Sequence, residues 1–334
     1  MAGLQHAWEY SSAARSKAKL RVSVLDLGST SFHLLVSDAS AATGLERIVR
    51  QRTHLRLGAF VAGAGWIPDE ACDRALETVA SLKRASDACR PDRLIAVATA
   101  AMRDAENGPE LAARIGEVLG TPVRMLSGEQ EARLIFAAFR HRLQLGGEHA
   151  LGADLGGGSL ELALGNDCDV CWETTLRLGV TMLHSEIVSG DPITPREREQ
   201  IRRRVRENLA PHLALIAASG ARRCIASGGT MRALTRLLTE ADDSAYRWST
   251  EGPAIRVKRR QLERLTEALL ESTHDERLEM AGIKRSRADL LPTGALILLA
   301  LLEACEIKEL VACDWGLREG VVLESIGLAS AGAH

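Results

Sequence analysis

One short stretch of the chain combines two carboxylates with a glycine turn. It runs Ala153-Asp-Leu-Gly-Gly-Gly-Ser-Leu-Glu161, so that Asp154 precedes three consecutive glycines and Glu161 follows them. Glycines leave backbone N–H groups open to close approach, and a nest of such donors favours an anion such as phosphate. Two carboxylates beside a bound phosphate would suit a hydrated Mg²⁺, which prefers oxygen ligands. The alternative is an ordinary glycine-rich hairpin with a solvated glutamate, because short glycine motifs have many false positives.

The same layout occurs earlier in the chain. Residues 24–36 contain Asp26-Leu-Gly-Ser-Thr-Ser-Phe-His33 between two apolar runs. Five aligned pairs are identical: Asp26 and Asp154, Leu27 and Leu155, Gly28 and Gly156, Ser31 and Ser159, Leu34 and Leu162. The two copies are much farther apart than the repeat period of a solenoid. We therefore expect two duplicated domains whose glycine turns face each other across a cleft and bind a phosphate chain from both sides.

The composition is that of a globular protein with room for two domains. The chain has 334 residues, of which 46% are hydrophobic and 26% charged, which allows a large buried core. A net charge of −2 gives no indication of nucleic-acid binding. Aromatic residues make up only 3% of the chain, so stacking platforms for single-stranded nucleic acid are not expected either.

Cysteine usage and hydropathy bear on location. The cysteines number seven and are scattered, which suits free thiols in a reducing compartment. Cys168 and Cys171 form a lone CxxC without the second pair of a zinc site. Residues 1–19 are polar and lack the apolar core of a signal peptide, and the apolar run 295–302 is too short to span a bilayer. We expect a flexible N-terminal tail, a cytoplasmic protein, and neither nucleic acid nor membrane as partner.

The hydrophobic pattern predicts an α/β chain with mixed sheets flanked by helices. In the first half, strands at 20–38 and 46–57 precede a glycine-rich loop at 58–68 and a helix at 69–89. A buried strand, a second helix capped by Asn107 and another strand follow. A helix at 129–142 stands between the halves.

The second half restarts with strands around the second glycine turn. A long helix begins at Pro195 with Thr194 as its cap, and a last strand and helix follow at 308–313 and 317–326. We divide the chain into a first domain at 20–145, a second at 146–316, and a helix at 317–328 that returns to the first domain.

Three further segments have residue types that suit phosphate chemistry. Ser227-Gly-Gly-Thr230 opens a helix after a strand, where N–H groups and the helix dipole favour an anion. Arg103 follows a buried strand, from which it could clamp a phosphoryl group. Glu131 lies in the first turn of the helix between the halves, either as a complement to the helix dipole or as a general base. The alternatives are a solvated arginine at position 103 and an ordinary strand–helix turn at residues 227–230, because both are common in proteins without a phosphate site.

Arginines crowd one predicted helix between residues 196 and 206. A solvated helix face is the first interpretation, and an electrostatic track for a long polyanion is the second. His33 occupies the position that Glu161 has in the second copy, and a satisfied histidine within a strand is the default interpretation there.

Together these segments resemble the exopolyphosphatase/guanosine pentaphosphate phosphatase family of the actin/Hsp70/sugar-kinase superfamily. The matching segments span nearly the whole chain in the family's order. They are Asp26-Leu-Gly-Ser-Thr-Ser-Phe-His33, Thr99-Ala-Ala-Met-Arg103, Ser127-Gly-Glu-Gln-Glu-Ala-Arg-Leu-Ile-Phe136, Asp154-Leu-Gly-Gly-Gly-Ser-Leu-Glu161, Ala226-Ser-Gly-Gly-Thr230 and Gly316-Leu-Arg-Glu-Gly320. The resemblance implies two duplicated actin-like, ribonuclease H-like domains with a cleft between them.

The resemblance also implies roles for single residues. Glu131 is the implied catalytic base, Arg103 contacts the substrate phosphate, and Asp154, Glu161 and Asp26 serve Mg²⁺, with Mn²⁺ as a second candidate. The implied phosphate-binding residues are Gly28, Ser29, Thr30, Ser31, Gly156, Gly157, Gly158, Ser159, Ser227, Gly228, Gly229 and Thr230. One departure is Thr30, where the family commonly has asparagine. Longer members carry an additional helical domain, so this chain resembles the short, two-domain form.

These observations predict a Mg²⁺-dependent phosphohydrolase. Its expected reaction removes the terminal phosphoryl group of inorganic polyphosphate, and the alternative substrate is the 5′ phosphate of guanosine pentaphosphate. A homodimer is a candidate assembly. Two other functions stay open: an ATP-dependent kinase of the same superfamily, and a nucleotide-sensing regulator without catalysis.

Overall fold

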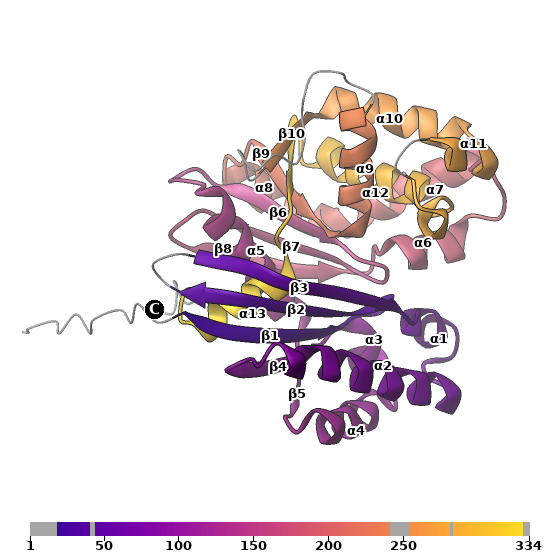
Figure 1. Ribbon diagram of the computed structural model, residues 1–334. Coiled ribbons are helices and arrows are strands. Elements are labelled where there is room, and N and C mark those ends of the chain that lie inside the picture. The colour runs from indigo at the N-terminus through magenta and orange to yellow at the C-terminus, as the bar shows by residue number, and fades with distance from the viewer. Residues whose placement is uncertain (1–18, 41–43, 241–253, 281–282, 330–334) are drawn as a thin grey trace, which may run out of the picture.

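The computed structural model describes residues 19–40, 44–240, 254–280 and 283–329 of the chain. They form two lobes, each built on one mixed β-sheet with helices packed against it (Figure 1). The expected α/β class with two mixed sheets is therefore confirmed. The expected polar loop at 242–252 and the expected tail, except for Lys19, lie outside the described residues.

The first lobe has a five-stranded sheet with the order β3-β2-β1-β4-β5. The strands are β1 (Leu20–Leu27), β2 (Ser31–Ser40), β3 (Gly44–His54), β4 (Arg93–Ala98) and β5 (Val123–Met125). Four helices pack on one face of it: α1 (Leu57–Ala64), α2 (Asp69–Ala88), α3 (Ala100–Asp104) and α4 (Gly108–Leu119). Strand β1 has apolar side chains on both faces, because Val22 and Val24 face one core cluster while Leu25 and Leu27 face another.

The second lobe has a six-stranded sheet with the order β10-β11-β9-β6-β7-β8. The strands are β6 (Ala150–Leu155), β7 (Leu160–Gly165), β8 (Val170–Leu176), β9 (Arg223–Ser227), β10 (Ala254–Lys258) and β11 (Glu309–Cys313). Its helices are α6 (Val180–Ile187), α7 (Pro195–Leu209), α8 (Leu213–Ala218), α9 (Gly228–Glu240), α10 (Arg259–Glu271), α11 (His274–Glu279) and α12 (Leu291–Ala304). As expected, Thr194 caps α7 through a reciprocal pair of bonds with Glu197.

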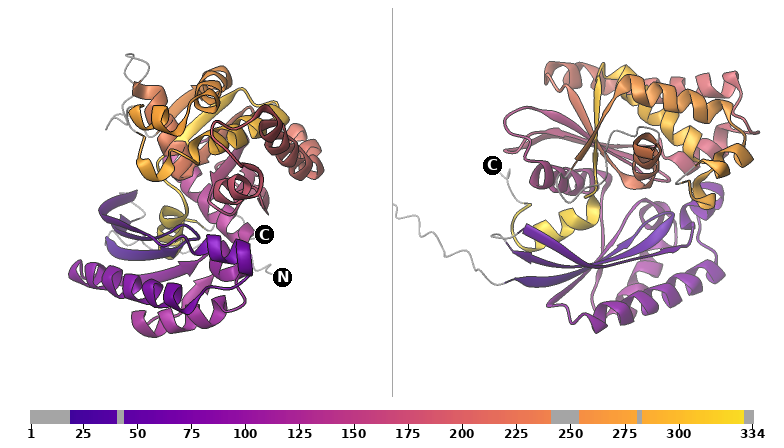
Figure 2. Two further views of the ribbon diagram at one scale, coloured as in Figure 1. Left: turned by 90° about the vertical axis from the view of Figure 1, so that its right-hand side faces the viewer. Right: turned by 45° about the horizontal axis from the view of Figure 1, so that its top comes forward.

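Two helices lie between the sheets and join the lobes. They are α5 (Gly128–Leu143) and α13 (Leu317–Ser325), and both views in Figure 2 show α13 beside the first sheet. One core cluster contains residues of both helices together with Val24 of β1, Ile225 of β9 and Val311 of β11. Helix α13 packs against α5 and β1, so the last helix of the chain supports the first sheet.

The two sheets repeat one topology. Strand β1 pairs antiparallel with β2 and parallel with β4, and β6 pairs antiparallel with β7 and parallel with β9. In the first hairpin Asp26 lies opposite His33, and in the second Asp154 lies opposite Glu161. The duplicated glycine turns therefore occupy equivalent places in the two lobes.

Two sequence predictions were wrong in detail. The expected loop at 58–68 contains helix α1, because Leu57, Phe60 and Val61 pack on the first core and outweigh the low helix propensity of the glycines. Asn107 does not cap α4 with its side chain. Its amide instead accepts from Ile67 N–H at 3.0 Å and donates to Ile67 C=O at 2.8 Å.

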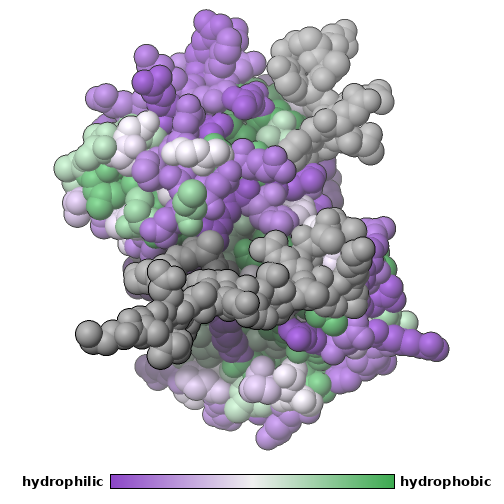
Figure 3. Space-filling model, turned by 90° about the vertical axis from the view of Figure 1, so that its left-hand side faces the viewer, coloured by the Kyte–Doolittle hydropathy of each residue, from purple (hydrophilic) through white to green (hydrophobic). Residues whose placement is uncertain are grey.

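Four short elements were not anticipated: α3, α6, α11 and β10. The helix expected from residue 287 begins at Leu291 as α12, after a 3-10 turn at Arg285–Arg287. No described helix has both the length and the hydropathy that a bilayer crossing requires. On the face shown in Figure 3, hydrophobic side chains appear as small patches among hydrophilic ones.

Candidate active site

A cleft of about 1170 Å³ lies between the lobes. Its lining includes both glycine turns, the start of α5, the start of α9 and the start of α13. All of the residues expected to bind phosphate or metal or to act in catalysis are among the residues that line it. The fold thus brings together segments from the whole length of the chain.

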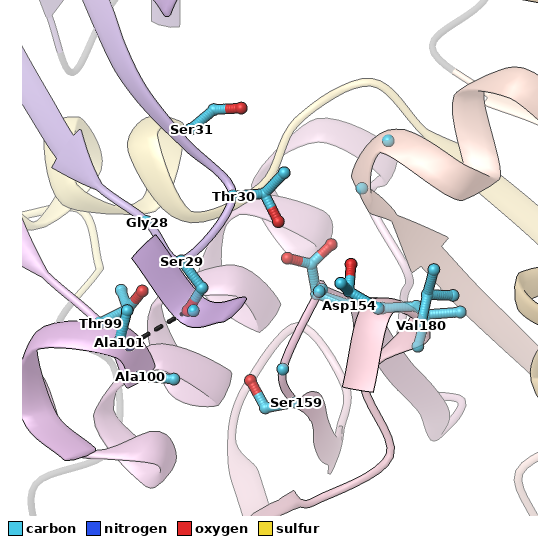
Figure 4. Close-up of a pocket in the computed structure, with 18 of the residues that line it drawn as sticks. Gly28, Ser29, Thr30, Ser31, Thr99, Ala100, Ala101, Asp154, Ser159 and Val180 are labelled. Carbon is cyan, nitrogen blue, oxygen red and sulfur yellow. Dashed lines mark hydrogen bonds between the residues drawn. The ribbon is translucent and has the colours of Figure 1, made fainter. Parts of the chain in front are cut away.

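The two glycine turns face each other directly (Figure 4). A Cβ atom placed on Gly157 would lie 2.5 Å from Thr30 Oγ1, and one on Gly158 would lie 3.9 Å from Ser29 Oγ. A side chain at position 157 would therefore force the Thr30 side chain to move. Thr30, which departs from the residue pattern noted in the sequence, lies at this point of closest approach.

Backbone carbonyls of both turns are held away from the cleft. In the second turn the carbonyls of Gly156, Gly157 and Gly158 accept hydrogen bonds from N–H groups between Gly179 and Met182 at 2.9–3.3 Å. In the first turn the carbonyls of Ser29 and Thr30 accept from N–H groups of residues 55, 56 and 58.

Four N–H groups of the two turns are left without partners in the described structure. Within the described ranges, those of Ser29, Thr30, Gly157 and Gly158 have no hydrogen-bond acceptor. Unpaired backbone donors are costly unless an acceptor reaches them. Converging N–H groups of this kind form an anion-binding nest, and here two such nests oppose each other.

Asp26 and Asp154 stand at the entrance of the two turns. Arg318 of α13 forms an ion pair with Asp26 at 3.1 Å, and Ser227 Oγ donates to Asp154 Oδ1 at 2.6 Å. Burial raises the pKa of both carboxyls, and that of Asp26 reaches about 6, where the charge of Arg318 opposes the rise and repulsion from Asp154 adds to it. Such repulsion between neighbouring carboxylates favours a bound cation.

Glu131 and Glu161 approach the same space. Glu161 is 2% exposed, and burial raises its pKa to about 7 although Ser159 and Thr175 donate hydrogen bonds to it. Burial also raises the pKa of Glu131 well above its usual value, and the charges of Glu161, Asp26 and Asp154 add to the effect. Glu131 Oε2 is buried and has no hydrogen-bond partner in the described structure.

Arg103 acts on Glu131 and Glu161 through its charge, although it forms no hydrogen bond with either of them in the described structure. Its Nη1 donates to the Leu126 carbonyl at 3.0 Å and its Nε pairs with Asp104 at 3.3 Å. Its charge lowers the pKa values of Glu131 and Glu161 against the larger effect of burial. It lines the cleft with 27% of its side chain exposed.

The carboxylates suit Mg²⁺, which needs few protein ligands, better than a metal that is held entirely by protein side chains. Within the described residues, no group of three or more His, Cys, Asp or Glu side chains is arranged to hold a metal. Mg²⁺ is usually held by one or two carboxylates, with water and substrate phosphate completing its shell. The donors present at Asp26, Asp154 and Glu161 fit this mode.

The third glycine turn makes contacts that the sequence did not predict. Gly228 has φ +97°, and a Cβ there would lie 2.9 Å from Asp154 Oδ1. A Cβ on Gly229 would lie 2.0 Å from Nη2 of Arg287. Thr230 is 6% exposed and packs against Gly294 of α12. These glycines therefore make room for Asp154 and Arg287.

Several cleft residues were not among the predicted site residues. They are Arg52, Arg177, Arg232, Arg287, Arg318 and Thr175. Arg318 falls in the Gly316–Gly320 segment that contributes to the family resemblance, but its partner Asp26 is nearly three hundred residues earlier in the sequence. No local pattern marks the others, because the cleft is formed only when the lobes pack together.

The crowded arginines of α7 are mostly paired. Arg202, Arg203, Arg204 and Arg206 form ion pairs with Glu303, Glu207, Glu186 and Glu199. Arg198 donates to the carbonyls of Ile193 and Leu270. This favours a solvated and structural helix face over a track for a polyanion.

Comparison with known proteins agrees with this geometry. A family model described as the Ppx/GppA phosphatase family matches residues 35–329. The chain belongs to the Ppx/GppA phosphatase family. It is 31% identical over 312 residues to exopolyphosphatase 1 of Mycobacterium bovis, covering 92% of this chain and 88% of that protein. It is 30% identical over 312 residues to exopolyphosphatase 1 of Mycobacterium leprae, covering 92% and 90%.

Solved structures of family members share the fold. The crystal structure of an exopolyphosphatase from Cytophaga hutchinsonii matches with a TM-score of 0.85 and 26% identity, over 94% of this chain and 100% of that one. The Ppx/GppA family member from Aquifex aeolicus matches with a TM-score of 0.76 and 25% identity, over 92% and 98%. The expected family, the two-domain actin-like fold and a hydrolase of the phosphatase class are thereby confirmed.

Proposed function

We propose that this Ppx/GppA phosphatase is an exopolyphosphatase, which releases the terminal phosphate of inorganic polyphosphate. The observation that carries the proposal is the pair of opposed N–H nests beside Glu131. Phosphoryl transfer depends mainly on positioning and charge neutralisation. Two opposed nests would hold a phosphate chain from both sides. The relatives named exopolyphosphatases support polyphosphate as the substrate.

Glu131 is the proposed general base. Its unpartnered Oε2 can accept a proton from an attacking water, and its raised pKa makes it a stronger base once it is ionised. His33 is the nearest rival, but burial and the charge of Arg318 lower its pKa well below the usual range. A histidine with so low a pKa is a weak base, which favours Glu131.

Charge neutralisation falls to the N–H nests, Arg103 and a metal ion. We propose Mg²⁺ held by Asp154 and Glu161, with Asp26 opposite, and Mn²⁺ as a second candidate. When bound, the ion would neutralise charge on the phosphoryl oxygens. Its charge would also favour the ionised form of the surrounding carboxyls, whose mutual repulsion opposes ionisation in its absence.

The alternative substrate is guanosine pentaphosphate, from which the same chemistry would remove the 5′ terminal phosphate. A non-catalytic regulator would bind this nucleotide without releasing phosphate. A cytoplasmic location and a homodimer remain predictions from the sequence alone.

One experiment separates these functions. The purified protein is incubated with Mg²⁺ and, in parallel, with short polyphosphate, long polyphosphate, guanosine pentaphosphate or ATP, and released phosphate is measured. We expect release from polyphosphate, at a rate that rises with Mg²⁺ concentration. Release from guanosine pentaphosphate alone would favour the alternative substrate, and ATP turnover only with an added acceptor would indicate a kinase.

A further inference from the structure

One end of the cleft gathers cations that the proposed reaction does not use. Arg52, Arg232 and Arg287 line this end together with His33. Arg52 comes from β3 in the first lobe, whereas Arg232 comes from α9 and Arg287 from the 3-10 turn before α12 in the second. The group is therefore completed only when both lobes are present.

Strand register places the first-lobe members. Asp26 lies opposite His33, and His33 lies opposite Arg52. Residues opposite each other on paired strands point to the same face of a sheet. Two strand spacings separate Asp26 from Arg52, which is about 10 Å across the sheet. A ligand held at Asp26 would therefore have to extend about 10 Å along the cleft to reach Arg52.

The second-lobe members converge on the first turn of α9. Arg232 follows Gly228 by four residues and Gly229 by three, so the three positions share one helix face. The Arg287 guanidinium lies against Gly229, where a Cβ would be 2.0 Å from Nη2. A side chain at position 229 would displace the Arg287 guanidinium from this place in the cleft.

These guanidinium groups form no direct ion pair in the described structure, although the charge of Asp154 acts on Arg232. Within the described residues, Arg52, Arg232 and Arg287 form no hydrogen bond or ion pair through their side chains. Two other arginines near the cleft are paired: Arg318 with Asp26, and Arg47 with Asp314 and Glu319. Burial, with added repulsion from neighbouring arginines, lowers the pKa of Arg232 to about 10 and shifts that of Arg287 in the same direction. A bound anion would relieve this repulsion.

We propose that Arg52, Arg232 and Arg287 form a distal anion subsite that binds a second phosphate group of the substrate, away from the group cleaved beside Glu131. This inference rests on the proposed function. Guanidinium groups match phosphate oxygens in geometry and stay charged. The second phosphate group is either an inner residue of polyphosphate or the diphosphate that guanosine pentaphosphate carries in addition to its triphosphate.

The lining favours an anion over a nucleobase at this subsite. Bases are commonly held by stacking on aromatic side chains. Among the described residues that line the cleft, Trp315 is the only Phe, Tyr or Trp. It is 6% exposed and stacks on His141, so its ring is already covered.

The test compares substrates that differ only in the distal group. Arg232→Gln and Arg287→Gln are assayed on tripolyphosphate against long polyphosphate, and on GTP against guanosine pentaphosphate. We expect KM to rise at least about tenfold, or about 1.4 kcal/mol, for the member of a pair that carries the distal group. The corresponding tripolyphosphate or GTP values should stay within about twofold, a difference of about 0.4 kcal/mol. The pair that responds identifies the source of the distal phosphate.

The control variants remove a charge elsewhere or keep it in place. Arg203→Gln removes an exposed arginine of α7 and should leave all four KM values unchanged. Arg232→Lys should retain part of the affinity because its charge remains. Equal losses on both members of each pair, or no loss in either pair, would overturn the subsite.

Direct binding keeps the subsite testable apart from catalysis. Calorimetry measures the binding of tripolyphosphate and of long polyphosphate to the wild type and to Arg232→Gln, with thermal unfolding as the check on folding. We expect weaker binding of the long chain only. If the wild type released no phosphate from any substrate, the proposed function would fail, yet this measurement would still support or overturn the subsite.

Discussion

The two hairpins that begin the lobes share a backbone but differ at one facing position. Asp26 and Asp154 occupy the same place in each, yet the residue opposite is His33 in the first and Glu161 in the second. Around Glu161 lie Glu131 and Thr175, whereas around His33 lie Arg52, Arg232 and Arg318. The duplicated backbone therefore supports one acidic end and one basic end of a single cleft.

The difference shows how a duplicated fold can acquire two unlike ends and so bind a ligand in one orientation. Both turns present unpaired N–H groups, so each can hold phosphate. The acidic end suits a metal ion and a general base, and the basic end suits the rest of a polyanion. A chain of phosphates would then enter in one orientation, with its terminal group toward Glu131.

The strongest test of the difference between the two ends removes each candidate base in turn. Glu131→Gln keeps the size of the side chain and removes the base, so turnover should fall by about 10²–10⁴, the usual worth of a general base. His33→Ala should reduce the chemical step much less, because the low pKa of His33 makes it a poor base. Single-turnover phosphate release, with polyphosphate binding measured separately, checks this.

The same experiment can also reverse the assignment. If Glu131→Gln turns over normally and His33→Ala is inactive while both still bind polyphosphate, the catalytic end of the cleft is the basic one. Retained binding in both variants is the control, since it shows that the lobes still close around the ligand.

The next effect concerns the metal. Asp154→Ala removes a carboxylate at the second turn and leaves Ser227 Oγ without its acceptor. We expect turnover to fall and the Mg²⁺ concentration for half-maximal rate to rise about tenfold, or about 1.4 kcal/mol. A Mg²⁺ titration of phosphate release measures this. An unchanged midpoint would remove Asp154 from the metal site, and Ser227→Ala serves as the matched control for the lost hydrogen bond.

Much of this arrangement could be predicted from the sequence. The aspartates and glycines form local motifs, and their repetition indicated two equivalent hairpins. Periodicity located the long helices, and Thr194 with Pro195 located the start of α7. These features depend on residues close together in the chain, so a pattern can reveal them.

The remaining features depend on contacts between distant segments. Helix α1 forms at a glycine-rich segment because Leu57 becomes buried in the core. Gly229 looks like a phosphate-loop glycine, but its lack of a side chain makes room for Arg287. The basic end of the cleft joins β3, α9 and the turn before α12, and no spacing in the sequence shows that these meet.

The pH dependence of thermal unfolding should reveal the buried carboxyl of Glu161 at the acidic end, without any substrate. Burial raises the pKa of Glu161 from 4.5 to about 7, so the folded protein holds a proton that the unfolded chain loses at lower pH. Without Mg²⁺, Glu161 should therefore stabilise the fold less as pH rises between about 4.5 and 7. Thermal unfolding across this range should show a smaller fall in stability for Glu161→Gln than for the wild type. If the stability of the wild type and of Glu161→Gln depended equally on pH, the raised pKa of Glu161 would be contradicted.

The smallest effect should come from the arginines of α7, which lie outside the cleft. Arg203 and Arg206 are more than half exposed and already paired with Glu207 and Glu199. Exposed charges are screened over about 8 Å at physiological salt, and their ion pairs contribute about 0–1 kcal/mol. The double variant Arg203→Gln/Arg206→Gln should therefore change KM for long and short polyphosphate alike, by at most about twofold, a difference of about 0.4 kcal/mol. A larger loss for long chains that shrinks at high salt would show that α7 guides polyphosphate and that the basic end of the cleft extends beyond it.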